Sequence, residues 1–192
     1  TGQKGIGKCT LAFFLINKIF SSFSLSNHLS DNQSNLIYKN SHPNVKYLTK
    51  ELDGKTDKIK NFISIDQIRN LNNFFHQSSL DNIPKFIIID SADDLNINSA
   101  NALLKNLEEP KKNTFFILIS HQPSNLLPTI RSRCSKFNLE IPTIDNFNKI
   151  LKLYDEHFNL NDLNFIYKFS NSSPGIAIQV NDKNLMSLYS DT

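Results

Sequence analysis

The sequence is poor in several residue types, and each shortage argues against a class of protein. It has no tryptophan, one methionine and two cysteines, Cys9 and Cys134. The cysteines lie far apart and neither belongs to a CxxC pair, which argues against a disulfide framework and against a four-ligand zinc site. No apolar run approaches the roughly 20 residues that a membrane helix needs, and no basic-then-apolar signal segment opens the chain. We therefore expect a cytoplasmic protein with no membrane partner.

The composition that remains is that of an ordinary globular protein. Hydrophobic residues make up 39% of the 192 positions, with 15 phenylalanines, which is too rich for a disordered chain. The length suits one domain, or one domain with a small satellite. The net charge of +3 is a mild basic bias that is compatible with nucleic acid but does not establish it.

Short, β-branched apolar runs predict the strands of a parallel sheet. Residues 86–90 and 115–120 are uninterrupted runs of this kind, typical of strands that are buried on both faces. A further short strand is expected at 45–48, inside the otherwise polar stretch 21–60. Alternating apolar residues predict another strand over 137–141.

Helical spacing of apolar residues predicts the elements that cover this sheet. Buried helices are expected over 10–23 and around 100–107, and a helix over 65–75 with Ser64 as its N-cap. The strand–helix–strand order then predicts an α/β fold with helices on both faces of the sheet.

The character of the sequence changes after Pro142. Residues 147–154 and 160–169 predict short amphipathic helices, and the turn at 172–175 predicts the start of another helix. We therefore expect a nucleotide-binding domain over 1–142 and a small helical domain over 143–192.

Residues 2–8 fit the phosphate-loop pattern G-x-x-x-x-G-K. Glycines in such a loop let successive backbone N–H groups converge on phosphate oxygens, and the lysine reaches the outer phosphates. The alternative is a glycine-rich turn before a helix, but the apolar helix and the downstream strand ending in aspartate favour the phosphate loop. A strand should precede such a loop, so we expect the chain to be a fragment that lacks its natural N-terminus. The candidate nucleotide-contacting residues are Gly2, Gly5, Gly7, Lys8, Cys9, Thr10, Asp90 and Ser120.

Two positions depart from the pattern of an active ATPase. Cys9 stands where a serine or threonine would bind Mg²⁺, and a thiol is a poor ligand for a hard cation; Thr10 comes one residue late. Asp90 ends a predicted strand, where such an aspartate would hold Mg²⁺, but Ser91 follows it in place of a glutamate that would orient water. ATP or ADP with a degenerate magnesium site is therefore the expected cofactor, without zinc, and intrinsic hydrolysis is disfavoured.

Two acids downstream of Ser91 could in principle replace the missing glutamate. Asp93 and Asp94 are displaced along the chain from the expected position. Acids that open or cap the next helix are the favoured interpretation.

Three blocks in order resemble bacterial clamp-loader subunits, the AAA+ proteins of DNA polymerase III. Residues 98–110 (NSANALLKNLEEP) resemble the NALLKxLEEP block, 119–121 resemble sensor 1, and 127–134 resemble the segment with the Ser-Arg-Cys motif. The resemblance covers essentially the whole chain and is weakest at 21–60. It implies a three-layer AAA+ sandwich with a helical lid. Because the family also has a C-terminal collar domain, we expect the chain to be a fragment without it.

Within this family the chain resembles the delta-prime type more than the gamma/tau motor type. The motor type has Asp-Glu-x-His where this chain has Asp-Ser-Ala-Asp at 90–93, a Thr or Ser at the position of Cys9, and a zinc-binding cysteine cluster. The alternatives are a gamma/tau-type motor, a self-sufficient ATPase that uses Thr10 and Asp93, and an unrelated nucleotide-binding scaffold, which the specific blocks disfavour.

The resemblance also implies roles and partners. Arg133 would be an arginine finger that reaches the ATP of a neighbouring subunit, although Arg131 and Arg133 could instead cap a strand at the domain edge. Ser120 would be the sensor 1 residue, and Ile176 stands where sensor 2 often has an arginine. The implied partners are gamma/tau and delta subunits, with the sliding clamp and primed DNA contacted through the complex during DNA replication.

Overall fold

The computed structural model describes residues 1–23, 36–37, 39, 41–54, 56–76, 83–155 and 163–182. The chain forms two compact units, Cys9–Lys136 on the one hand and Thr1–Lys8 with Phe137–Thr192 on the other. Residues at the start of the chain thus belong to the same unit as the C-terminal helices. The domain limits expected at 142 and 143 stay a prediction. No helix in the described ranges is long and apolar enough to cross a bilayer.

The larger unit is built on a parallel sheet of three strands in the described residues. Strands β1 (Val45–Leu48), β2 (Lys85–Asp90) and β3 (Thr114–Ile119) lie in the order β1-β2-β3. Leu48 pairs with Ile89, and Asp90 pairs with Ile119, so the strands end at a common edge. These three strands confirm the predictions for 45–48, 86–90 and 115–120.

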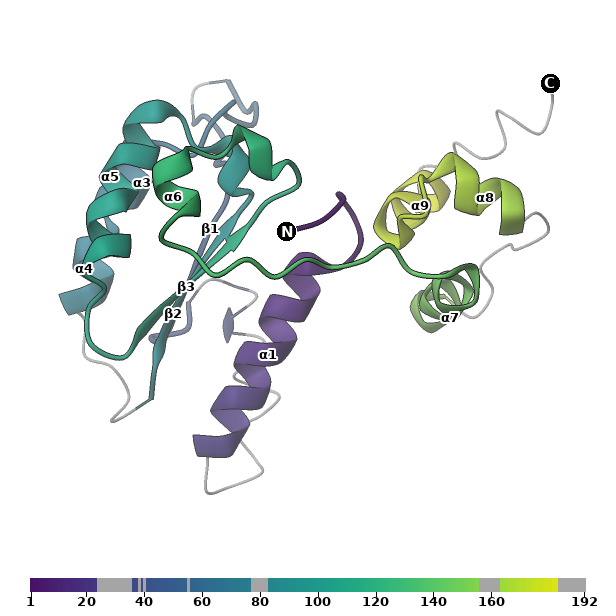
Figure 1. Cartoon of the computed structure of the whole chain (residues 1–192), viewed down its shortest axis with the longest axis horizontal. Helices are drawn as coiled ribbons and strands as arrows, with labels where there is room; N and C mark the ends of the chain where they lie inside the picture. The colour runs from purple at the N-terminus through teal and green to yellow at the C-terminus, as the bar shows by residue number, and fades with distance from the viewer. Residues whose placement is uncertain are drawn as a thin grey trace. The chain divides into compact units, whose positions relative to one another are not determined.

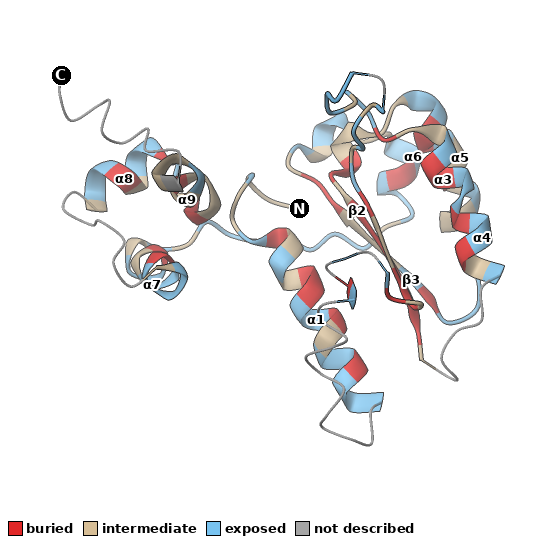
Figure 2. Cartoon of the chain, turned by 180° about the vertical axis from the view of Figure 1, so that it is seen from behind, coloured by how far each residue is buried: buried red, intermediate tan, exposed pale blue. Residues whose placement is uncertain are grey.

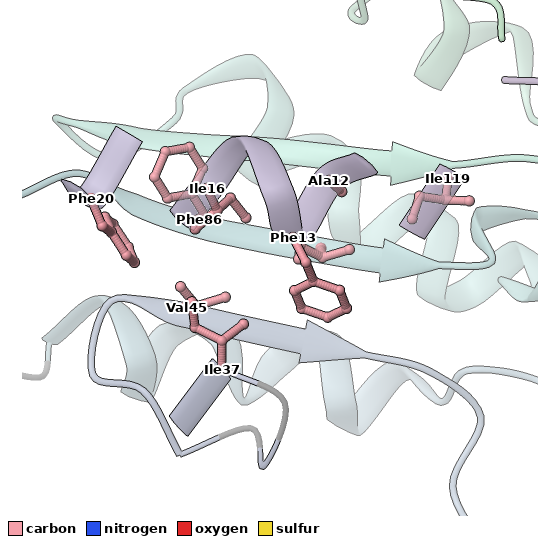
Figure 3. Packing of buried hydrophobic residues seen from close by; sticks show 9 residues of the cluster. Ala12, Phe13, Ile16, Phe20, Ile37, Val45, Phe86 and Ile119 are labelled. Atoms are coloured by element: carbon pink, nitrogen blue, oxygen red, sulfur yellow. The ribbon is translucent and has the colours of Figure 1, made fainter. Parts of the chain in front are cut away.

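Helix α1 (Lys8–Phe23) covers one face of the sheet. Its buried residues pack on inward-facing side chains of all three strands, as Figure 3 shows. In β2 these inward-facing residues are Phe86 and Ile88. The buried positions of the helix are Ala12, Phe13, Ile16 and Phe20. Figure 2 shows buried positions along one side of α1 and exposed positions along the other.

The opposite face is covered by α3 (Ile65–Arg69), α4 (Leu71–His76) and α5 (Ile97–Glu108), which Figure 1 shows side by side. Ile87 and Ile89 of β2 point into this second core, together with Leu103 of α5. Alternate β2 residues therefore enter two cores, which is why its sequence is apolar without interruption. The result is the three-layer α/β arrangement that the sequence predicted.

The helix predicted over 65–75 is instead two helices that are separated at Asn70. Ser64 is the N-cap of α3 as predicted. Its Oγ accepts from the backbone N of Gln67 at 3.3 Å, and the Gln67 Oε1 accepts from the backbone N of Ser64 at 2.9 Å. This reciprocal pair satisfies two N–H groups that have no partner within the helix. Helix α3 ends at Asn70, whose N–H is directed to the carbonyls of Asp66 and Ile68.

The strand predicted over 137–141 was wrong. The segment is irregular, and Phe137 and Ile141 are 70% and 51% exposed. Among the described residues its backbone pairs only with Thr1, whose N donates to the Phe137 carbonyl at 2.6 Å and whose carbonyl accepts from the Leu139 N at 2.9 Å. A strand needs a neighbour that offers a ladder of hydrogen bonds, and in the described chain one residue is too short for this.

Three helices form the core of the smaller unit: α7 (Ile144–Tyr154), α8 (Leu163–Phe169) and α9 (Pro174–Asp182). Phe147, Leu151, Ile166 and Ala177 are buried together between them. The helices predicted after residue 142 are thus confirmed, except that part of the range expected for the second, 160–162, lies outside the described residues.

Removal of a buried side chain from α5 tests the core packing on the second face of the sheet. Leu103 is fully buried, whereas Ile97 on the same helix is 70% exposed. Leu103→Ala should lower the free energy of unfolding by about 2–5 kcal/mol, because it leaves a cavity. Ile97→Ala, the control, should change it by no more than about 0.5 kcal/mol. Urea denaturation of both variants measures the difference, and equal losses would contradict this packing.

Candidate functional site

The predicted phosphate loop has the backbone conformation that its glycines permit. Gly2, Gly5 and Gly7 have φ values of 142°, 79° and 89°, a region that is costly for residues with a side chain. Lys8 is buried, and its ammonium donates to the carbonyl of Gly2 at 2.6 Å and to the carbonyl of Gln3 at 2.5 Å. The lysine is therefore turned onto its own loop. The glycines and the lysine fit a phosphate-binding loop, and nucleotide binding itself stays a prediction.

The same loop packs closely on the start of α9, within the smaller unit. Ser173 Oγ donates to the Lys4 carbonyl at 2.9 Å, and the Gly175 N donates to the Gly5 carbonyl at 2.9 Å. A Cβ added to Gly5 would lie 2.2 Å from Ser173 Oγ. Glycine is thus required at position 5 by close approach as well as by its φ.

Cys9 lies beside an aromatic hydroxyl and a carboxylate at the start of α1. Its Sγ donates to the Tyr47 OH at 4.0 Å, and this hydroxyl donates to Asp90 Oδ2 at 3.2 Å. Burial, and then the charge of Asp90, raise the pKa of Cys9 to about 12. The thiol is consequently protonated at neutral pH and does not fit a magnesium site. Thr10, which only the alternative of a self-sufficient ATPase would use in its place, is exposed.

Asp93 joins the ends of β2 and β3. Its carboxylate accepts from Ser91 Oγ at 2.8 Å, from Ser120 Oγ at 2.7 Å, from the Gln122 N at 3.3 Å and from the His121 N. Burial raises the pKa of Asp93, but these hydrogen bonds outweigh it and place the pKa below its ordinary value. Both carboxylate oxygens are therefore engaged in holding two strand ends together.

The predicted helix-opening role of the two acids holds only in part. Asp93 and Asp94 lie in a short 3-10 helix (Ala92–Asp94), but the N-cap of α5 is Asn96, whose Oδ1 accepts from the Ser99 N at 2.9 Å. Asp94 forms an ion pair with Lys50 at 3.1 Å. Both acids are thus engaged in contacts within the chain.

Arg133 follows the short helix α6 (Pro128–Arg131) and is held by contacts within its own chain. Its Nη1 donates to the Thr129 carbonyl at 2.8 Å, and its Nη2 lies 2.6 Å from Glu108 Oε1 at the end of α5. Arg131, in contrast, is exposed and makes no side-chain hydrogen bond or ion pair within the described ranges. The pairing of Glu108 with Arg133 was missed by sequence reasoning, although both residues lie in blocks that it singled out.

Comparison with known proteins gives the family. Residues 1–143 match the family described as "DNA polymerase III, delta subunit". The chain belongs to this family. The match includes the phosphate loop, the sheet, Asp93 and the Glu108–Arg133 pair.

Curated relatives in this family carry the name "DNA polymerase III subunit delta'". The protein of Pseudomonas aeruginosa is 48% identical over 80 residues, which are 42% of this chain and 24% of the relative. The protein of Bacillus subtilis is 36% identical over 134 residues, 69% of this chain and 38% of the relative. The chain therefore spans well under half the length of these relatives.

A solved structure supports the fold. The crystal structure of a DNA polymerase III gamma subunit-related protein from Thermotoga maritima is similar with a TM-score of 0.50 and 25% identity, over 68% of this chain and 38% of that one. With the family match, this likeness confirms the predicted α/β AAA+ fold and the predicted family. The roles of the individual site residues, Arg133 included, stay predictions.

Substitution of Asp93 tests whether its carboxylate is structural. In Asp93→Asn an NH₂ replaces one acceptor oxygen: it would face the backbone N–H donors of His121 and Gln122, or else require the Ser120 hydroxyl to turn and accept. Because the hydrogen bonds to a charged acceptor are lost in either orientation, the free energy of unfolding should fall by about 1.5–3 kcal/mol. Asp94→Asn, the matched control, removes an ion pair that is partly exposed (33% and 29%) and should cost less than about 1 kcal/mol. A stable Asp93→Asn protein would contradict the structural role.

The lowered pKa of Asp93 also predicts how this difference depends on pH. A carboxyl whose pKa is depressed on folding stabilises the protein above its unfolded-state pKa, and this contribution is lost as pH falls through the folded-state value. The stability difference between wild type and Asp93→Asn should therefore be constant near neutral pH and shrink below the ordinary aspartate pKa of 3.8. Urea titrations at several pH values measure it, and a difference that grows on acidification would exclude this linkage.

Proposed function

We propose that this chain is part of a delta'-type subunit of the DNA polymerase III clamp loader, and that it promotes ATP hydrolysis on a neighbouring subunit without hydrolysing ATP itself. The names of the curated relatives support the assignment to the loader. By the same resemblance the partners are gamma/tau and delta subunits, and the complex places the sliding clamp on primed DNA in the cytoplasm.

The main support for the proposal that this chain does not hydrolyse ATP is that the Asp93 carboxylate is occupied by hydrogen bonds. Ser91, at the position of the missing glutamate, donates a hydrogen bond from its hydroxyl to Asp93. Asp93 also accepts hydrogen bonds from the residues that follow β3. A general base needs a lone pair within reach of the attacking water. The protonated thiol of Cys9 likewise offers little to Mg²⁺.

Arg133 is the group proposed to act in trans. Arginine is always charged, and its planar fork of N–H groups matches phosphate oxygens. Placed against the ATP of a neighbour, its guanidinium would stabilise negative charge that develops during phosphoryl transfer. Its side chain is 34% exposed, which leaves part of the side chain open to a partner.

The phosphate loop keeps a second candidate function open, that of an active gamma/tau-type motor. Gly2, Gly5, Gly7 and Lys8 would hold the phosphates of ATP or ADP if a nucleotide binds. Lys8 is the observation that favours this alternative, since a lysine at this position contacts outer phosphates in P-loop proteins. Turnover by the isolated full-length protein separates the two functions.

A rebuilt loader tests the proposed function. In it, only the ATP site next to this subunit keeps its P-loop lysine, and clamp- and DNA-dependent hydrolysis is measured with full-length wild type, Arg133→Ala and Arg131→Ala. Arg133→Ala should reduce turnover on the order of tenfold or more, as loss of an arginine finger does. The control Arg131→Ala should stay within about twofold, because an exposed side chain that makes no hydrogen bond or ion pair in the described residues contributes little. Turnover by the isolated protein, or indifference to Arg133→Ala, would contradict the proposal.

A further inference from the structure

We infer that Glu108 is a positioning residue for Arg133: the carboxylate at the end of α5 holds the guanidinium in the orientation in which it meets the neighbour's phosphate. This inference rests on the proposed function of Arg133 and adds to it the residue that directs the side chain. The starting observation is the 2.6 Å contact between Arg133 Nη2 and Glu108 Oε1.

Several contacts together fix the guanidinium. Besides the Glu108 contact, Nη1 donates to the Thr129 carbonyl at 2.8 Å and to Ser132 Oγ at 3.4 Å. The guanidinium is thus held between the end of α5 and the turn of α6. Arginine has five N–H donors in a rigid plane, so Nε–H and the second N–H of Nη2 remain for a phosphate. A long side chain held in this way loses less freedom when it binds than one that is free to rotate.

The position of Glu108 on its helix argues that the carboxylate serves this pair. Glu108 is the last residue of α5, where the negative end of the helix dipole disfavours an anion. The positive charge of Arg133 offsets that unfavourable position. The carboxylate is 49% exposed and the guanidinium side chain 34%, so water screens the pair and its share in the stability of the fold is small. Loss of Glu108 should therefore release Arg133 without unfolding the protein.

The chain offers a matched control in the next residue. Glu109 carries the same charge one position later, is exposed, and makes no side-chain hydrogen bond or ion pair within the described part of the chain. Substitution at Glu109 changes the net charge by the same amount as substitution at Glu108, but leaves Arg133 as it is. A difference between the two variants thus reports on the contact and not on general electrostatics.

The test uses the rebuilt loader with one competent ATP site, with full-length Glu108→Ala, Glu109→Ala, Arg133→Ala and the double variant Glu108→Ala/Arg133→Ala. Glu108→Ala should lower the maximal rate on the order of tenfold, since a small misplacement of a catalytic group has a large effect on rate, with KM for ATP unchanged. Glu109→Ala should stay within about twofold. The double variant should equal Arg133→Ala, because residues that act as one unit are not additive.

Folding and geometry are checked in the same set. Glu108→Ala should still assemble, and its Tm should move by no more than about 4 °C, as expected for the loss of an exposed ion pair. Glu108→Gln keeps an acceptor oxygen for Nη2 and should recover part of the rate. If Glu108→Ala proves unstable, the maximal rates of Glu108→Gln and of the double variant, each compared with wild type and Arg133→Ala, test the positioning role instead.

The outcomes separate this inference from the function on which it rests. If Arg133→Ala lowers turnover and Glu108→Ala does not, or raises it, the positioning role is overturned and the arginine finger survives. If the two single losses multiply in the double variant, the residues act independently and the inference is likewise overturned. If Arg133→Ala has no effect, the proposed function fails, and the inference fails with it.

Discussion

The carboxylate of Asp93 joins the carboxyl ends of β2 and β3, and the site depends on this junction. It accepts from Ser91 Oγ after β2, and from Ser120 Oγ and two backbone N–H groups after β3. The strands themselves are fixed by two apolar cores, one on each face, but hydrophobic packing does not determine how the polar ends meet. Hydrogen bonds to a charged acceptor are directional and stronger than neutral ones. A single side chain thereby sets the geometry of the edge at which a P-loop protein would do its chemistry.

Polar side chains at the ends of β2 and β3 can either hold the strands together or activate water for hydrolysis. An acid that activates water has to be accessible and sufficiently basic. The Asp93 carboxylate is instead occupied by hydrogen bonds, which also lower its pKa and so make it a weaker base. Cys9, whose pKa is raised, keeps its thiol protonated and is therefore a poor ligand for Mg²⁺. Arg133, the group proposed to act on a neighbour's nucleotide, is held by Glu108 and by the Thr129 carbonyl. These contacts support the proposed division of labour, in which a bracing subunit acts on its neighbour's nucleotide.

Most of the fold could be predicted from the sequence, because it depends on local periodicity. The apolar run of β2 indicated burial on both faces, and Ser64 marked the start of α3. The strand expected over 137–141 is absent because strand formation depends on a partner, and within the part of the chain that the structure describes only Thr1 pairs with this segment. The site was predictable in its parts but not in its contacts. The bonds of Asp93 to Ser120 and of Arg133 to Glu108 join residues that lie 27 and 25 positions apart, which no spacing rule connects.

Whether Arg133 acts on a neighbour's ATP while Asp93 stays structural is tested most directly by the structure of the assembled loader, with full-length protein and a non-hydrolysable ATP analogue on the neighbouring subunit. Arg133 nitrogens should lie within hydrogen-bonding distance of the neighbour's terminal phosphate, about 3 Å, with Glu108 still in contact with the guanidinium. Asp93 should keep its bonds to the ends of both strands. An Arg133 that is turned away from the neighbour's nucleotide, or an Asp93 that has left Ser120 to hold a water at this subunit's own phosphate loop, would contradict the proposal.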